Sequence, residues 1–304
     1  MKHPVTSYPD GTAAPKAAGA PRRRRSAVNI AAARKRILAY LTLALFTVIA
    51  VYPVLRIVTI SLRPGDQLLS KSLAIIPDDA TIDNFRVLLT ETLFLRWMLN
   101  SLIVSFVVTI TGVALASTAG YAMSRYRFVG RGPLMSGLLV TQMFPATMLL
   151  LPLYVVLINL KLLDSYVGIC IIYTATALPF CVWQMKGYYD TIPIALEEAA
   201  RIDGATPWQT FRRIIFPLAA PALVITALFS FMTAWNEYVV ANVVLQSVDR
   251  FTLPLGLKLF QGQMTTQWGL YAAGSLLVSV PVVVLFLVLS RYLISGLTLG
   301  AVKG

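Results

Sequence analysis

Residues 99–123 read LNSLIVSFVVTITGVALASTAGYAM, a run without a charged residue. A helix needs about 20 mostly apolar residues to cross the ~30 Å hydrocarbon core of a bilayer. Working outward from this run, five further runs are apolar and long enough for the same interpretation. We therefore expect six membrane spans, at approximately 37–60, 99–123, 134–157, 167–183, 217–240 and 272–293.

The composition of the whole chain agrees with a bilayer as its solvent. The 304 residues are 57% hydrophobic and only 13% charged, with a mean hydropathy of +0.73, whereas soluble domains carry about 25% charged residues. An ordinary soluble enzyme is thereby excluded. Prolines 145, 179 and 281 fall inside or near the ends of spans, which bilayer helices tolerate. The predicted fold class is all-α, a polytopic membrane protein with six transmembrane helices.

The net charge of +13 suggests nucleic acid until the basic residues are located. Nine of the 26 lie in residues 1–36 and the others are spread over short loops, which argues against a nucleic-acid partner. One side of the predicted topology holds 18 basic residues and the other 8. The positive-inside rule then places both termini in the cytoplasm of a multi-pass protein of the inner membrane. We expect residues 1–26 to be disordered and the arginines at 22–25 to orient the chain and touch anionic lipid.

The usual residues of a catalytic or metal centre are scarce. Cys170 and Cys181 would lie roughly 16 Å apart along one helix, too far for a disulfide, and the single histidine is His3. The sequence has no phosphate-binding loop of the G-x-x-x-x-G-K-[ST] type and no metal-ligand cluster. We predict no catalytic residue, no metal and no cofactor in this chain.

Ionisable side chains are also rare inside the spans, whereas ion-coupled transporters need them to bind the coupled ion. A secondary transporter and a membrane-embedded enzyme are thus the weaker alternatives. A pathway built by such a chain needs an energy source in another chain, or none.

Polar residues follow one face of two spans. Two interpretations stay open for these faces: close packing between helices, or the wall of a polar pathway, for which the stripe ending in a carboxylate is the better candidate. The residues are Thr226, Ser230, Thr233 and Glu237 in the fifth span and Ser101, Ser105, Thr109 and Gly112 in the second.

The longest internal cytoplasmic loop, 184–216, reads as two short helices. The first follows Pro193 and is broken by Gly204; the second begins at Thr206, an N-cap followed by proline. We expect this helix–Gly–helix elbow to lie in a groove of another protein, since its alanines allow close approach and its carboxylate gives a directional partner for Arg or Lys. A helix lying on lipid is the alternative.

The elbow resembles the EAA motif of ABC-importer permeases. The residues that carry the resemblance are Glu198-Ala199-Ala200, Gly204 three residues later, Ile214 and Phe216-Pro217, with Phe216 where the family usually has leucine. Other segments resemble the carbohydrate-uptake subgroup and, within it, the maltose/maltodextrin permease subunits. They are 100–102, 119–125, 142–146, 178–188, 196–209 and 296–304.

The resemblance implies a type I ABC-importer transmembrane domain. It covers residues 37–304 and implies a first helix and external loop at 37–94, a core at 95–295 with the EAA loop at 192–217, and a cytoplasmic C-terminal tail at 296–304. Residues 1–36 lie outside the resemblance, and we expect them to form a disordered basic cytoplasmic tail. The implied partners are a second permease subunit, two ATPase subunits that bind ATP, and an extracytoplasmic sugar-binding protein. The implied ATPase contacts are Glu197, Glu198, Ala199, Ala200, Asp203 and Gly204.

The resemblance also implies a substrate class. Maltose or maltodextrin is the leading expectation, with another oligosaccharide or glycerol phosphate as the alternative, and the sugar contacts lie largely in the partner permease. We expect the uncharged segment 261–267, through Gln261, Gln263 and Gln267, to touch the binding protein. Glycine at 296, 300 and 304 predicts that the sixth helix stops before residue 296.

Overall fold

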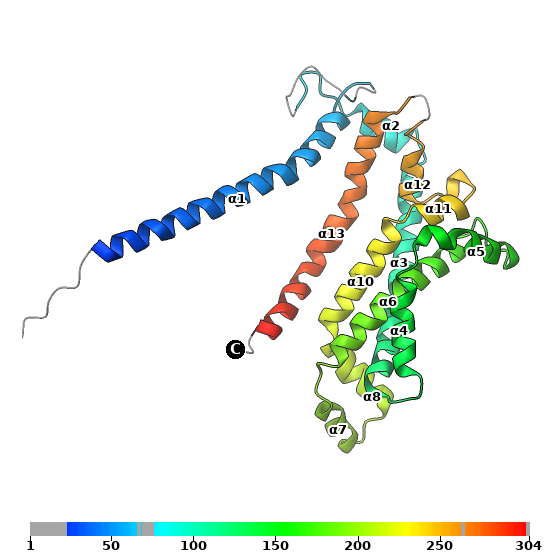
Figure 1. Ribbon diagram of the computed structural model, residues 1–304. Helices are drawn as coiled ribbons and strands as arrows, with labels where there is room; N and C mark the ends of the chain where they lie inside the picture. Colours follow the sequence, from blue (N-terminus) through cyan, green and yellow to red (C-terminus); the bar gives the residue numbers. More distant parts are fainter. Residues whose placement is uncertain (1–22, 66–67, 69–75, 263–264, 302–304) are drawn as a thin grey trace, which may run out of the picture. The chain divides into compact units, whose positions relative to one another are not determined.

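The computed structural model describes residues 23–65, 68, 76–262 and 265–301, and every regular element among them is a helix (Figure 1). The chain divides into two compact units, 1–54 and 55–304, and each is described by itself. The first unit holds most of α1 (Arg23–Ser61).

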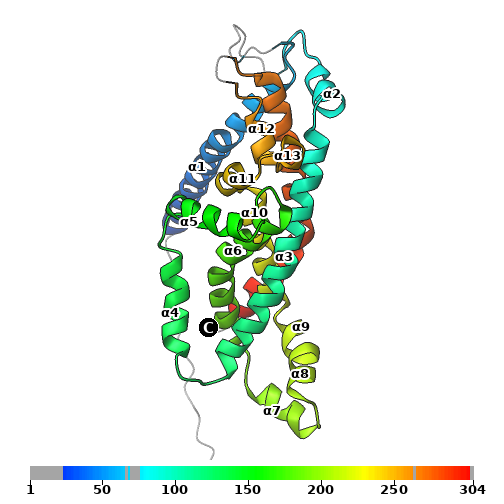
Figure 2. The same cartoon turned by 90° about the vertical axis from the view of Figure 1, so that its right-hand side faces the viewer.

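The second unit carries the remaining elements, and Figures 1 and 2 label its α-helices. They are α2 (Asp83–Thr90), α3 (Phe94–Arg125), α4 (Arg131–Thr141), α5 (Ala146–Asn159), α6 (Tyr166–Tyr189), α7 (Ala195–Ile202), α8 (Pro207–Thr210), the π-helical turn η1 (Phe211–Ile215), α9 (Phe216–Leu218), α10 (Ala220–Trp235), α11 (Val239–Val244), the 3₁₀ turn η2 (Val248–Arg250), α12 (Leu253–Lys258) and α13 (Trp268–Ala301).

The core of the second unit is formed where α3, α6 and α10 pack together. Small residues let the backbones approach: a Cβ on Gly112 would lie 2.8 Å from Ser230 Oγ, and one on Gly120 would lie 2.8 Å from Met185 Cβ. Such contacts are typical of helices that associate in lipid. Large buried side chains fill the two ends of this bundle, Tyr189 at the elbow end and Trp235 at the other.

Four helical segments among the described residues are long and apolar enough to cross a membrane: Arg34–Ser61, Phe94–Arg125, Tyr166–Tyr189 and Trp268–Ser290. A fifth candidate is the pair Pro207–Leu218 and Ala220–Trp235, bent by 78°. These segments correspond to the first, second, fourth, sixth and fifth predicted spans.

The third predicted span, 134–157, is not one helix. It is divided between α4 and α5, and Figure 2 shows α5 running across the direction of α4. Pro145 explains the break, because its ring disfavours helical backbone at the residue before it. In the connection between α4 and α5, the Gln142 side chain donates a hydrogen bond to the carbonyl oxygen of Thr176 in α6 at 3.0 Å.

Two helix ends differ from expectation. α1 begins at Arg23, so the prediction of disorder is wrong for 23–26 and for the remainder of the 1–36 tail that α1 covers; arginine and alanine are good helix formers. α13 continues to Ala301, so the prediction of a stop before residue 296 is also wrong. Each glycine costs about 1 kcal/mol relative to alanine, but extending a long helix needs no new nucleus. Residues 1–22 and 302–304 lie outside the described part.

Candidate functional site: the elbow between α6 and α10

The elbow predicted from the sequence is present. α7 ends where Gly204 takes a left-handed backbone conformation, φ +83°, which glycine adopts without steric penalty. A capping box then starts α8: the Thr206 hydroxyl accepts from the Gln209 amide, and the Gln209 side chain accepts from the Thr206 amide at 2.9 Å. Local sequence signals alone therefore define both short helices.

The outer surface of the elbow combines acidic and apolar side chains. Glu198, Ala199, Asp203 and Gly204 are exposed, and no ion pair within the described residues involves either carboxylate. Ile202 is 86% exposed and Trp208 62%, so two large apolar side chains are available on this surface. This acidic and apolar face, which we call the outer face, is suited to a partner with basic and apolar groups.

Two of the predicted contact residues point the other way. Ala200 is buried, and Glu197 is only 2% exposed. One carboxylate oxygen of Glu197 accepts from Nε of Arg125, and the other accepts from the Tyr121 hydroxyl at 2.8 Å. Glu197 and Ala200 are therefore corrected to internal residues, because α7 is amphipathic and turns this face toward α3.

The end of α6 is tied to the end of α3 by a second set of polar contacts. The Ser124 hydroxyl donates to one oxygen of Asp190 at 2.7 Å, and Lys186 pairs with the other at 2.6 Å. Burial alone raises the pKa of the Asp190 carboxyl, but these hydrogen bonds and the positive charge of Lys186 outweigh it, so the pKa lies below its ordinary value.

The polar stripe of the fifth predicted span is divided by the structure. Thr226 and Ser230 have no exposed surface. The Thr226 hydroxyl donates to the Gln184 side chain at 2.6 Å, and the Ser230 hydroxyl lies 3.5 Å from the sulfur of Cys181. Both side chains therefore lie in packing contacts between helices of this chain, which favours the packing interpretation. Cys181 and Cys170 are free, as expected.

Glu237 and Thr233 are partly exposed. The carboxylate of Glu237 accepts from the backbone amides of Val240 and Ala241, at 2.8 and 3.1 Å, and from the Tyr173 hydroxyl at 2.7 Å. It thus satisfies two of the first amides of α11. α10 itself ends at Trp235, before residue 240, where the sequence had placed the end of the span. Thr233 donates to the Phe229 carbonyl of its own helix.

The described residues of the segment 261–267, namely 261–262 and 265–267, connect to α12 and α13 and are hydrogen-bonded to each other and to the end of α12. Gln261 pairs with Thr266 in an isolated antiparallel bridge, and the Gln267 amide donates to the Phe260 carbonyl at 2.9 Å. The Gln267 side chain is exposed, and that of Gln261 is partly buried and accepts from Lys258. Gln263 lies outside the described residues.

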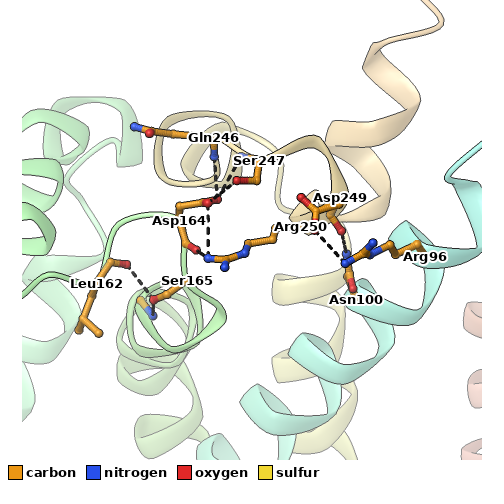
Figure 3. Close-up of polar contacts among 10 residues, drawn as sticks. Arg96, Asn100, Leu162, Asp164, Ser165, Gln246, Ser247, Asp249 and Arg250 are labelled. Carbon is orange, nitrogen blue, oxygen red and sulfur yellow. Dashed lines mark hydrogen bonds and ion pairs between the residues drawn. The ribbon is translucent and has the colours of Figure 1, made fainter.

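A polar network joins the α5–α6 connection to the segment around η2 (Figure 3). Asp164 accepts from the amides of Gln246 and Ser247 at 3.0 and 3.1 Å and from the Ser247 hydroxyl at 2.5 Å, and Arg250 lies 3.4 Å from the same carboxylate. Burial alone raises the pKa of Asp164, but these hydrogen bonds and the Arg250 charge together lower it below its ordinary value.

The same segment is held to α3 on its other side, also in Figure 3. Arg96 pairs with the Asp249 carboxylate at 2.8 Å, and the Asn100 side chain donates to the carbonyls of Asp249 and Phe251, both at 3.0 Å. The network therefore holds the segment around η2 between α3 and the α5–α6 connection.

Replacing Asp164 with asparagine is expected to destabilise the folded chain by about 1–3 kcal/mol at pH 7, because a carboxylate that accepts three hydrogen bonds is lost. A lowered folded-state pKa means that this stabilisation is present above the ordinary pKa of about 4 and is lost as the pH falls below it. The difference in melting temperature between variant and wild type in detergent should therefore shrink from pH 7 to pH 3. An equal difference at both pH values would contradict this account.

Residues 112–297 match the family described as binding-protein-dependent transport system inner membrane component. This range includes α6, the elbow and α10. The chain belongs to this family. As a family member, it is an inner-membrane component of a transport system, in agreement with its apolar helices. Within the described residues, no group of three or more His, Cys, Asp or Glu is placed to hold a metal ion.

Two curated members of the family are similar over almost their whole length. The maltodextrin transport system permease protein MdxG of Bacillus subtilis (strain 168) is 37% identical over 283 residues, 91% of this chain and 100% of MdxG. The maltose/maltodextrin transport system permease protein MalG of Escherichia coli (strain K12) is 35% identical over 284 residues, 87% of this chain and 95% of MalG.

Solved structures share the fold of the family. A chain of a bacterial ABC transporter involved in the import of the acidic polysaccharide alginate superposes with a TM-score of 0.75 at 24% identity, covering 90% of this chain and 99% of that one. A chain of the MetNI methionine ABC transporter superposes with a TM-score of 0.51 at 19% identity, covering 67% and 95%. The type I ABC-importer fold expected from the sequence is thereby confirmed.

The sequence analysis missed Arg125 and Tyr121 as site residues. Both belong to the 119–125 segment that carried part of the resemblance, but nothing in it indicates a partner 72 to 76 residues away. The signal available was weak: a basic residue closing one span and an extra acidic residue preceding the EAA motif.

Proposed function

We propose that this chain is a permease subunit of an ATP-driven importer that moves maltose or maltodextrins across the inner membrane. The observation that carries the proposal is its identity of 35–37% with MdxG and MalG over about nine-tenths of its length. Such a level of identity between full-length chains favours a shared transport role, and the outer face of the elbow supplies a surface for a motor subunit.

The proposal includes a division of labour. A second permease subunit completes the pathway, two ATPase subunits bind ATP, and an extracytoplasmic binding protein delivers the sugar. The elbow lies on the cytoplasmic side and meets the ATPase through Glu198, Ala199, Asp203 and Gly204. The segment 261–267 lies on the opposite side and meets the binding protein. The lack of a phosphate-binding loop in the sequence supports the need for separate ATPase chains.

The experiment is sugar uptake by proteoliposomes that contain the purified complex of this chain with its cognate permease, ATPase and binding protein. We expect ATP-dependent accumulation of labelled maltotriose, and competition by unlabelled maltodextrins but not by glycerol 3-phosphate. Uptake that needs no ATP but follows a proton gradient would overturn the class, in favour of a secondary transporter. ATP-dependent uptake of a different oligosaccharide alone would keep the class and overturn the substrate.

A further inference from the structure

The Arg125–Glu197 pair differs in kind from the exposed carboxylates of the elbow. The Arg125 side chain is 8% exposed and that of Glu197 2%. Arg125 also donates from one terminal nitrogen to the Ile192 carbonyl at 2.9 Å and from the other to the Ser124 hydroxyl at 3.0 Å. One guanidinium thus holds the carboxylate of α7, the connection before α7 and its own helix.

The pair lies at the centre of a continuous polar chain. From Ser124 the contacts continue to Asp190 and Lys186 at the end of α6, and from Glu197 they continue to the Tyr121 hydroxyl. The ring of Tyr121 packs at 4.8 Å from the ring of Phe211 in the following turn η1. Both arms of the elbow are therefore fastened to the last turn of α3.

The burial of the Arg125–Glu197 pair indicates what the pair is for. A buried ion pair is seldom more stabilising than apolar side chains of similar size, and its best attested use is to fix one geometry. The surroundings are apolar enough to offer that alternative, since Tyr121, the hydrogen-bond partner of Glu197, belongs to an apolar cluster with the fully buried Met185 and Ile215. The planar guanidinium of Arg125 donates hydrogen bonds to three partners at once. This geometry restricts the elbow to one orientation on α3.

We propose that Arg125 and Glu197 are positioning residues that make the elbow move with α3 as one body, so that a displacement of the elbow by the ATPase reaches the membrane helices. This inference rests on the proposed function of the elbow. It assigns the coupling of elbow and membrane helices to Glu197, on the inner face of α7, which is the face that packs against α3. It assigns ATPase binding to Glu198, on the outer face. Because Glu197 and Glu198 are adjacent but lie on different faces of α7, substituting one or the other tests coupling and ATPase binding separately.

The test compares Glu197→Gln in the reconstituted complex with Glu91→Gln as the matched control. Glu91 is an exposed carboxylate at the end of α2, remote in sequence from the elbow. The quantities measured are ATPase co-purification, ATP hydrolysis and sugar molecules taken up per ATP. We expect Glu197→Gln to keep the ATPase bound and hydrolysing while uptake per ATP falls at least fivefold. Glu91→Gln should keep the wild-type ratio.

Three further variants separate positioning from simple loss of folding. Tyr121→Phe removes a single hydroxyl from the Glu197 carboxylate and should reduce uptake per ATP in the same direction, but less. The exchange Arg125→Glu with Glu197→Arg should recover part of the ratio lost in Glu197→Arg alone. An assembled Glu197→Gln complex with the wild-type ratio would overturn the inference. Loss of ATPase binding in Glu197→Gln, with the chain folded, would also overturn it by making Glu197 a contact residue.

Discussion

A Glu198→Lys variant is expected to lose its ATPase subunits while the chain itself stays folded. Glu198 is exposed on the outer face of α7 and has no ion-pair partner within the described residues. A charge-assisted hydrogen bond to a partner contributes about 1.5–3 kcal/mol, and reversal of the charge adds repulsion. We expect affinity for the ATPase to fall by about tenfold to a hundredfold or more, and uptake to fall with it.

The measurement is quantitative co-purification with tagged ATPase, with melting temperature of the permease as the check on folding. Glu91→Lys makes the same charge reversal at an exposed carboxylate of α2 and should leave the ATPase bound. If Glu198→Lys and Glu91→Lys retain equal amounts of ATPase, the outer face is not the docking surface, and the proposed function of the elbow is wrong. That outcome is distinct from a failure of the Arg125–Glu197 coupling, which leaves binding intact.

A Gly256→Ala variant is expected to destabilise the packing of α12 on α3 strongly. A Cβ at this position would lie 2.2 Å from the ring of Trp97. Trp97 cannot move aside easily, because it is 3% exposed and its indole nitrogen donates to the Val248 carbonyl at 2.8 Å. Overpacking of this kind costs typically about 1–3 kcal/mol and sometimes more.

Whether Gly256→Ala lowers or raises the melting temperature is a sharper test than the size of the change. Helix propensity alone favours alanine over glycine by about 1 kcal/mol, so a substitution judged by propensity would stabilise α12. Gly137 in the middle of α4 provides the matched control, since a Cβ there meets nothing within 4 Å. Gly137→Ala should leave the melting temperature unchanged or slightly raised, whereas Gly256→Ala should lower it. A rise in both would contradict the packing described here.

Local signals in the sequence predicted the elbow well. Proline at 193 and 207, glycine at 204 and the Thr206 cap each act within a few residues, so the chain needs no distant contact to form these turns. Four of the six predicted spans correspond to single helices long enough to cross a membrane, and a fifth corresponds to the bent pair, because length and apolar composition suffice for a bilayer helix.

The remaining features depend on contacts that the linear sequence does not contain. The break around Pro145 was missed because proline within a bilayer helix is compatible with both a kink and an end. Thr226 and Ser230 lie on a face that packs against α6 and α3, which their spacing alone could not distinguish from a pathway wall. The Arg125–Glu197 pair required knowing that the last turn of α3 lies beside α7.

The π-helical turn η1 fixes the angular register between the elbow and α10. Its wider turn is visible in the hydrogen bond from the Phe216 amide to the Phe211 carbonyl, five residues apart, which accommodates one residue more than an α-helical turn. Successive residues of an α-helix are rotated by about 100°. Deleting one residue from 211–215 would therefore restore a regular α-helical turn and leave the elbow facing as it does now. Deleting one residue from the regular helix α10 would instead turn everything before it by roughly that angle about the axis of α10. The acidic outer face would then be turned away from the ATPase, although every side chain of the docking surface would still be present.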